Sequence, residues 1–311
     1  MRILVLGAGG TGGYFGGRLA EAGADVTFLV RPARAAALRE TGLRIRSPLG
    51  DADLAVATLT ADAVVSPYDL VLLSCKAYDL DDAIRVLAPA VGPETLILPV
   101  LNGLAHLDRL DAAFGAARVL GGLCVISATV GPAGEIQHLN QIQTLTFGAR
   151  SAAVPASRCA AIAAAFAGAK FEVRLSDDID HDMWGKFVFL TALASATCLM
   201  RGNVGAIMAT TDGEAIIRDL FAECESVAVA SGQATAPATQ AASLRSLTER
   251  GSPLAASMLR DIEAGRSIEA DSIIGDMQRR GRSLGLPLPL LRLALCHAQT
   301  YLARRRQAPR S

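Results

Sequence analysis

The first twelve residues constrain the fold of this chain more than any other segment. A short apolar run, Ile3–Leu6, is followed at once by glycines at positions 7, 9 and 12. This G-x-G-x-x-G spacing, after a predicted strand and at the start of a predicted helix, is typical of a dinucleotide-binding loop. The glycines permit a tight turn, close approach of the backbone to a pyrophosphate, and close helix–strand packing. We expect the cofactor-binding loop to comprise Gly7, Ala8, Gly9, Gly10, Thr11 and Gly12.

The first half of the chain alternates short apolar runs with helical stretches, which predicts a mostly parallel sheet covered by helices. The expected strands are Arg2–Leu6, Asp25–Val30, Asp69–Cys75 and Thr95–Pro99, and the expected helices are Thr11–Ala22, Ala33–Thr41, Leu80–Ala90 and Ala105–Phe114. Turn residues between Leu43–Arg46 and Leu54–Thr58 predict an inserted hairpin. Three later runs are expected to continue the sheet: Val119–Ser127, Glu135–Leu139 and Thr144–Phe147.

From about Ser176 the strand signals end and segments of helical period follow. The first of these helices is expected to begin near Asp177–Asp180 and to run past Met200 to Gly202. The others are expected at Glu214–Ala230, Pro237–Glu249, Pro253–Glu263, Ile268–Leu284 and Pro289–Arg304. The sequence therefore predicts an α/β Rossmann-type dinucleotide-binding domain at residues 1–175, followed by an all-α domain for substrate and catalysis at residues 176–311.

Composition argues against several classes of protein. The 311 residues carry 30 basic and 30 acidic side chains, so no net charge attracts a polyanion, and we expect no nucleic-acid partner. Six scattered cysteines without C-x-x-C spacing predict reduced thiols in the cytoplasm, with neither disulfides nor a metal site. The most apolar long run, Phe187–Met200, is shorter than a membrane span requires, so we expect a buried helix and no membrane partner.

Polar residues after three of the predicted strands extend the candidate cofactor site. An NAD site usually carries Asp or Glu after the second strand, but here that strand runs into Arg31, whose guanidinium suits the 2′-phosphate of NADP(H). Arg34 is close enough in sequence to assist. Lys76 and Asn102 follow the next strands, where an open α/β sheet binds its ligands, so we expect both to contact the cofactor.

With these residues assembled, the chain resembles the ketopantoate reductase family, the NADPH-dependent 2-dehydropantoate 2-reductases, along essentially its whole length. The resemblance rests on ordered motifs: the glycine loop, Arg31, Ser74–Ala77, Asn102-Gly103, Trp184–Lys186, Ser257–Asp261, and Glu269–Asp271 before Gly275. It implies a Rossmann-type domain and a helical domain with the active site in the cleft. It also implies reduction of a 2-oxo acid to a 2-hydroxy acid, as in the conversion of ketopantoate to pantoate in pantothenate biosynthesis.

The resemblance also assigns roles to individual residues. Lys186 corresponds to the general acid that protonates the carbonyl oxygen while NADPH delivers hydride to the carbon. Glu269 corresponds to the acid that orients this lysine and touches the cofactor. Asn102 and Ser257 match positions that contact substrate or nicotinamide, and Asn203 lies near a further substrate position.

Three departures from the family pattern concern the substrate. Positions one and two turns after Lys186 usually carry asparagines, and here they are Leu190 and Ala194; another common Asn position is Leu254. Loss of these polar contacts favours a more apolar 2-oxo acid over ketopantoate, because a pocket built for a hydroxyl discriminates strongly and an apolar pocket does not.

Two other functions compete with this interpretation. One is a hydroxy-acid dehydrogenase with His181 as the acid, which is disfavoured because His181 and Lys186 lie ~140° apart on a helix. The other is a regulatory module that binds NADPH without catalysis, which would have no chemical need for Lys186 and Glu269. The expected partner is a small-molecule 2-oxo acid. The sequence does not decide between a monomer and a homodimer.

Overall fold

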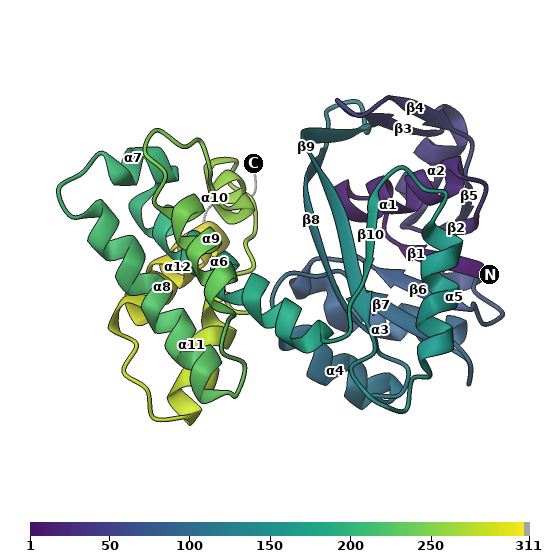
Figure 1. The fold of residues 1–311 in the computed structure, drawn as a ribbon. Coiled ribbons are helices and arrows are strands. Elements are labelled where there is room, and N and C mark those ends of the chain that lie inside the picture. Colours follow the sequence, from purple (N-terminus) through teal and green to yellow (C-terminus); the bar gives the residue numbers. More distant parts are fainter. Residues whose placement is uncertain (308–311) are drawn as a thin grey trace. The chain divides into compact units, whose positions relative to one another are not determined.

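A computed structural model describes residues 1–307 of the chain and divides into two units (Figure 1). The first unit contains residues 1–101 and 106–180. The second contains residues 102–105 together with the residues from 181 onward. Four residues from the first half of the chain therefore belong to the unit formed by the second half.

The first unit is built on a five-stranded sheet in which all neighbouring strands are parallel. Its order is β5-β2-β1-β6-β7, and the strands are β1 (Arg2–Leu6), β2 (Asp25–Leu29), β5 (Ala57–Leu59), β6 (Leu70–Leu73) and β7 (Leu96–Pro99). The strands end in one row, since Leu6 is in register with both Leu29 and Leu73, and Leu73 with Pro99. The residues that follow these strands therefore meet at one edge of the sheet, the ligand-binding edge of α/β folds.

Four helices connect the strands of this sheet or follow them. They are α1 (Gly10–Glu21), α2 (Pro32–Thr41), α3 (Leu80–Leu87) and α4 (Ala105–Phe114). The near-continuous apolar strands are buried, which is the pattern of a parallel sheet covered on both faces. The predicted α/β architecture is confirmed, with element ends that differ by a few residues.

The strands after residue 119 form a second sheet, so the prediction that they continue the first sheet is wrong. This sheet has the order β10-β9-β3-β4, with β8 paired to β9. Its strands are β3 (Leu43–Arg46), β4 (Ala52–Leu54), β8 (Gly121–Val130), β9 (Ile136–Gly148) and β10 (Glu172–Leu175), and α5 (Ala156–Phe166) precedes β10. The predicted hairpin also changes, because only β4 pairs with β3, whereas β5 joins the first sheet beside β2.

The glycines of α1 allow a second sheet to pack closely against this helix. A Cβ at Gly10, Gly13 or Gly17 would lie within 3 Å of Ala128, Ile136 or Ile45 of the second sheet. A Cβ at Gly16 would instead lie 2.9 Å from Phe28 and Val5 of the first sheet. Helix α1 therefore packs closely against both sheets, and the β8–β9 hairpin covers the face of α1 opposite the first sheet (Figure 1).

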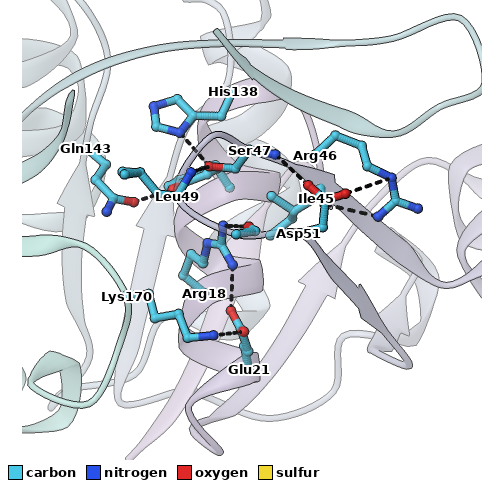
Figure 2. Close-up of polar contacts among 12 residues, drawn as sticks. Arg18, Glu21, Ile45, Arg46, Ser47, Leu49, Asp51, His138, Gln143 and Lys170 are labelled. Atoms are coloured by element: carbon cyan, nitrogen blue, oxygen red, sulfur yellow. Dashed lines mark hydrogen bonds and ion pairs between the residues drawn. The ribbon is translucent and has the colours of Figure 1, made fainter. Parts of the chain in front are cut away.

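A buried arginine ties α1 to the turn between β3 and β4 (Figure 2). Arg18 is fully buried; its guanidinium donates to Glu21 at 2.7 Å and to the Gly50 carbonyl, and lies 5.1 Å from the Tyr14 ring centroid. Burial alone would lower the pKa of Arg18, but its hydrogen bonds to Glu21 and Tyr14 raise it overall. Lys170 donates to the other oxygen of Glu21. This network fixes the helix that begins at the glycine loop.

Replacing Arg18 by methionine should therefore destabilise the first unit. We expect Arg18→Met to lower the free energy of unfolding by ~2–4 kcal/mol, because the Gly50 carbonyl and the half-buried Glu21 carboxylate lose a fully buried, charged partner. Arg85→Met is the matched control, since Arg85 forms an exposed pair with Asp82 of the kind that contributes little. Urea unfolding followed by circular dichroism measures both, and equal midpoints for the two variants would contradict this account.

The second unit consists of helices, as predicted from the loss of strand signals after Ser176. They are α6 (Ile179–Met200), α7 (Val204–Met208), α8 (Gly213–Ala230), α9 (Pro237–Leu247), α10 (Ser257–Glu263), α11 (Ile274–Ser283) and α12 (Pro289–Gln307). The predicted helix starts at Pro253 and Ile268 are too early. The carbonyls of Ser252 and Leu254 accept hydrogen bonds from Gly205 and Val204, which holds residues 252–254 outside a helix.

Helix α6 is long and apolar enough to cross a membrane by length and composition. However, 67% of its apolar 18-residue window is buried inside the protein. Such burial is typical of the core helix of a folded domain. The helix is longer than the apolar run at Phe187–Met200 because it begins with the polar turn that precedes Trp184.

Candidate active site

The glycine loop follows β1 at the carboxyl edge of the first sheet. Gly7 adopts a left-handed conformation (φ +91°), and its N–H donates to the Leu29 carbonyl of β2 at 2.9 Å. A Cβ at Gly12 would lie 2.6 Å from the Gly7 carbonyl oxygen, so this loop can be this tight only with glycine there. Gly9 is the N-cap of α1. The first N–H groups of α1 have no partner within the helix, so they are available to an anion such as a pyrophosphate.

Two basic residues named from the sequence follow strands that end in the same row. Arg31 is the N-cap of α2, directly after β2, and its guanidinium lies 3.5 Å from Asp79. Lys76 follows β6, is half-buried, and precedes the short turn that contains Asp79. The glycine loop, Arg31 and Lys76 are thus brought to one edge of the first unit, and the residues present there fit a dinucleotide.

Asn102 and Lys186 are brought together in the second unit although 84 positions separate them. The Lys186 ammonium, on α6, donates to Oδ1 of Asn102 at 3.1 Å. Asn102 comes three residues after β7 and lies in the segment 102–105 that belongs to the helical unit. The polar end of a lysine is therefore oriented by an amide oxygen beside the largely buried stretch Phe187–Leu190 of α6.

Gly103 explains how the backbone beside Asn102 approaches the helical unit so closely. It has φ +79°, and a Cβ there would lie 2.8 Å from the Ser272 carbonyl oxygen and 3.7 Å from the Phe187 ring. The turn that contains Ser272 also contains Glu269, whose carbonyl accepts from Ser272 Oγ at 3.1 Å and from the Ile273 N–H at 3.2 Å. The segment after β7 thus packs on the turn that carries Glu269.

Glu269 is buried, with 7% of its surface exposed, and it precedes α11 rather than lying within it. Asp276 of α11 accepts hydrogen bonds from Arg279 and Arg280, and the Arg280 guanidinium lies 5.6 Å from the Trp184 ring. Trp184 is two residues before Lys186. These contacts anchor the start of α6 against α11.

The remaining residues named for the substrate lie on three segments of the second unit. Ser257 is half-buried at the first position of α10. Asn203 is the N-cap of α7, and its Oδ1 accepts from the Ala206 N–H at 2.8 Å, so that oxygen is committed to the helix end. Leu190 is half-buried and lies one turn after Lys186, whereas Ala194, one turn further on, is fully buried.

Other chemistries have less support in this unit. His181 is half-buried in the first turn of α6, five residues before Lys186. Burial raises the pKa of the Cys198 thiol to about 12, which leaves it protonated and unreactive at neutral pH. Within residues 1–307 no three His, Cys, Asp or Glu side chains are grouped so that they could hold a metal ion.

Two contributors to the site have no signal in the sequence. Ser272 shapes the site through its backbone carbonyl, which any residue could supply, and the Asn102-Gly103 motif does not indicate the contact between Gly103 and Ser272. Arg34, named as an assistant to Arg31, proves to donate to the Ala8 carbonyl of the glycine loop at 3.1 Å. These are long-range contacts that a local pattern does not specify.

Comparison with known proteins identifies relatives of both halves of the chain. Residues 3–152 match the family model described as ketopantoate reductase PanE/ApbA, and residues 178–300 match the C-terminal model of the same family. An uncharacterized oxidoreductase of Bacillus subtilis, YkpB, is 38% identical over 303 residues, which cover 97% of this chain and 99% of that protein.

Solved structures agree with this match. A PanE/ApbA family ketopantoate reductase from Ralstonia eutropha has 27% identity and a TM-score of 0.88, covering 98% of this chain and all of that one. D-mandelate dehydrogenase, solved with NADH and anilino(oxo)acetate, superimposes with a TM-score of 0.88 over 98% of this chain and all of that one. At 19% identity, this second likeness concerns the fold alone.

Proposed function

Because the chain belongs to the ketopantoate reductase family of oxidoreductases, we propose that it reduces a 2-oxo acid to the 2-hydroxy acid with NADPH. The observation that carries the proposal is the hydrogen bond from Lys186 to Asn102, which orients an ammonium in the helical unit. We further propose that residues 1–175 hold the cofactor, that residues 176–311 bind the substrate, and that the enzyme works in the cytoplasm.

The chemistry requires a hydride for the substrate C2 and a proton for its carbonyl oxygen. The bound nicotinamide supplies the hydride. Lys186 stabilises the negative charge that develops on the oxygen and then transfers a proton from Nζ to it, which yields the hydroxyl group. Asn102 limits the orientations of the ammonium, and buried Glu269 on the adjoining turn is the proposed acid that positions it.

The presence of lysine rather than arginine at position 186 supports this role. Only three of the 30 basic residues are lysines, namely Lys76, Lys170 and Lys186. An arginine remains protonated at all working pH values, whereas a lysine ammonium can give up a proton and regain it from water. A lysine at position 186 therefore suits proton transfer in a chain that otherwise uses arginine for positive charge.

NADPH is proposed over NADH because the second strand ends at arginine rather than at an acid. Arg31 stands where Asp or Glu would accept from a ribose 2′-hydroxyl. Its 78% exposed side chain can leave Asp79, which is itself 40% exposed, because an ion pair so exposed is held only weakly. The positively charged start of α2 then favours a phosphate there.

An apolar 2-oxo acid is the proposed substrate, in preference to ketopantoate. Lys186, Leu190 and Ala194 follow one another at intervals of four residues on α6 and so lie along one helix face. The side chains that continue this face from Lys186 offer no hydrogen bond for a substrate hydroxyl. The amide oxygen of Asn203 caps α7, and the carbonyl of Leu254 accepts from Val204, so both of these acceptors already have a partner within the second unit.

The proposed activity is tested with a panel of 2-oxo acids in the presence of NADPH. We expect at least one acid with an aliphatic or aromatic side chain to have a higher kcat/KM than ketopantoate. Leu190→Asn should move that ratio toward ketopantoate by ~10-fold, because it restores a hydrogen-bonding group one turn from Lys186. Absorbance at 340 nm measures each rate.

The matched control is Leu293→Asn, the same change at an exposed position of α12. It should leave the ratio unchanged. Ketopantoate as the best substrate of the panel would overturn the substrate proposal, and no NADPH oxidation with any of the acids would overturn the proposed activity.

A further inference from the structure

Two arginines outside the glycine motif lie against the same turn of the first unit, at residues 131–135. Arg34, on the first turn of α2, donates from Nη2 to the Ala8 carbonyl at 3.1 Å. Arg44, on β3, donates to the Ala133 carbonyl in the turn between β8 and β9. The charge of Arg44 acts on Arg34 only as a like charge, which disfavours the Arg34 cation.

The β8–β9 turn at residues 131–135 fits around Arg34. Gly134 has φ +78°, and a Cβ at this position would lie 3.0 Å from Nη1 of Arg34. The Gly131 and Gly134 amides close the turn by donating to the carbonyls of Glu135 and Gly131. Three segments that are distant in sequence therefore meet at the Arg34 guanidinium: α2, the β8–β9 turn and the glycine loop.

The charge of Arg34 lacks a counter-charge in the described part of the chain. Arg34 is half-buried and, among residues 1–307, no carboxylate forms an ion pair with it. Burial and the neighbouring Arg44 charge lower the pKa of Arg34. Arg31 differs on both counts, since its side chain is 78% exposed and lies 3.5 Å from Asp79. A half-buried cation that faces a like charge is stabilised by an anion that joins the two.

We propose that Arg34, supported by Arg44, is the principal contact for the ribose 2′-phosphate of NADPH, and that Arg31 is a secondary contact. This inference rests on the proposed function. Arg31 is the N-cap of α2 and Arg34 lies in its first turn, and α2 follows the strand whose end marks the ribose 2′ position. Arg34 also donates to the Ala8 carbonyl, which holds its guanidinium beside the glycine loop.

The experiment separates the 2′-phosphate from the rest of the cofactor. Adenosine 2′,5′-bisphosphate and 5′-AMP are titrated calorimetrically into the wild-type protein, Arg34→Met, Arg31→Met and Arg39→Met. Arg34→Met should weaken binding of the bisphosphate by ~10–100-fold, the range for loss of a charge-assisted contact, while 5′-AMP binding changes less than ~2-fold. Arg31→Met should have a smaller effect on the bisphosphate. Arg39→Met removes the same charge from an exposed position of α2 and should have none.

Several outcomes would overturn this assignment. A loss for Arg34→Met that is equal for both nucleotides would make Arg34 only a support for the glycine loop, and a larger loss for Arg31→Met would reverse the order of the two residues. Inorganic phosphate that competes as well with 5′-AMP as with the bisphosphate would also contradict a 2′-phosphate site. Arg39→Met, which lies outside the candidate site, should keep wild-type turnover. The nucleotide titrations do not depend on turnover, so failure of this assignment leaves the proposed reductase activity testable on its own.

Discussion

Lys186→Ala should lower turnover by ~10²–10⁴-fold, the usual contribution of a positioned general acid. Removal of the ammonium leaves the developing alkoxide without a proton donor, and the Asn102 amide that the lysine contacts at 3.1 Å cannot replace it. NADPH affinity should change little, because the glycine loop, Arg31 and Lys76 belong to the other unit. Stopped-flow single-turnover kinetics with saturating NADPH measures the rate of the chemical step.

Two further variants separate charge from proton transfer. Lys170→Ala, the matched control, removes an exposed lysine that pairs with Glu21 and should keep normal turnover. Lys186→Arg keeps the positive charge but holds its proton too tightly to donate it, so it should stay far below the wild type. A near-normal single-turnover rate in Lys186→Ala would show that another group donates the proton, with His181 the next residue to test.

Gly103→Ala should lower turnover by ~10–100-fold, since small displacements of a positioned group carry costs of this size. The residue has φ +79°, and a Cβ would lie 2.8 Å from the Ser272 carbonyl oxygen, so the backbone beside Asn102 must move away from the turn that carries Glu269. The lysine then loses its orienting amide. Steady-state kcat with the best 2-oxo acid measures the effect.

A matched glycine distinguishes this contact from general backbone strain. Gly285 has φ +73° with no atom within 4 Å of a built Cβ, so Gly285→Ala imposes similar strain without the clash and should keep normal turnover. If Gly103 acts through Asn102, Gly103→Ala should cost little more once Asn102→Ala is present. Additive losses in the double variant would show that Gly103 acts by another route.

The sequence predicts those parts of the fold that depend on local patterns. The apolar runs of β1, β6 and β7 and the glycine spacing after β1 are sufficient to predict a parallel sheet with a dinucleotide loop at its edge. Lys186 and Glu269 could be named only by resemblance to a family, because a lysine on a helix and an acid near a helix start have many roles.

The features that the sequence did not predict depend on long-range packing. The second face of glycines on α1, Gly10, Gly13 and Gly17, receives a separate sheet, yet in sequence these residues merge with the cofactor motif. Likewise, α10 begins later than the predicted start at Pro253, because the carbonyls of Ser252 and Leu254 accept hydrogen bonds from residues about 50 positions earlier. Such partners are specified by the tertiary structure and not by periodicity.

The transfer of deuterium from [4-²H]NADPH to a 2-oxo acid tests the proposed reaction most directly. With the preferred acid, the wild-type enzyme should give a 2-hydroxy acid one mass unit heavier, with the deuterium at C2, from the cofactor isotopomer labelled on the transferring face. The same product should form at least ~100-fold more slowly with Lys186→Ala. NADPH oxidation that leaves no deuterium at C2 with either isotopomer, or no product with any 2-oxo acid, would contradict the account.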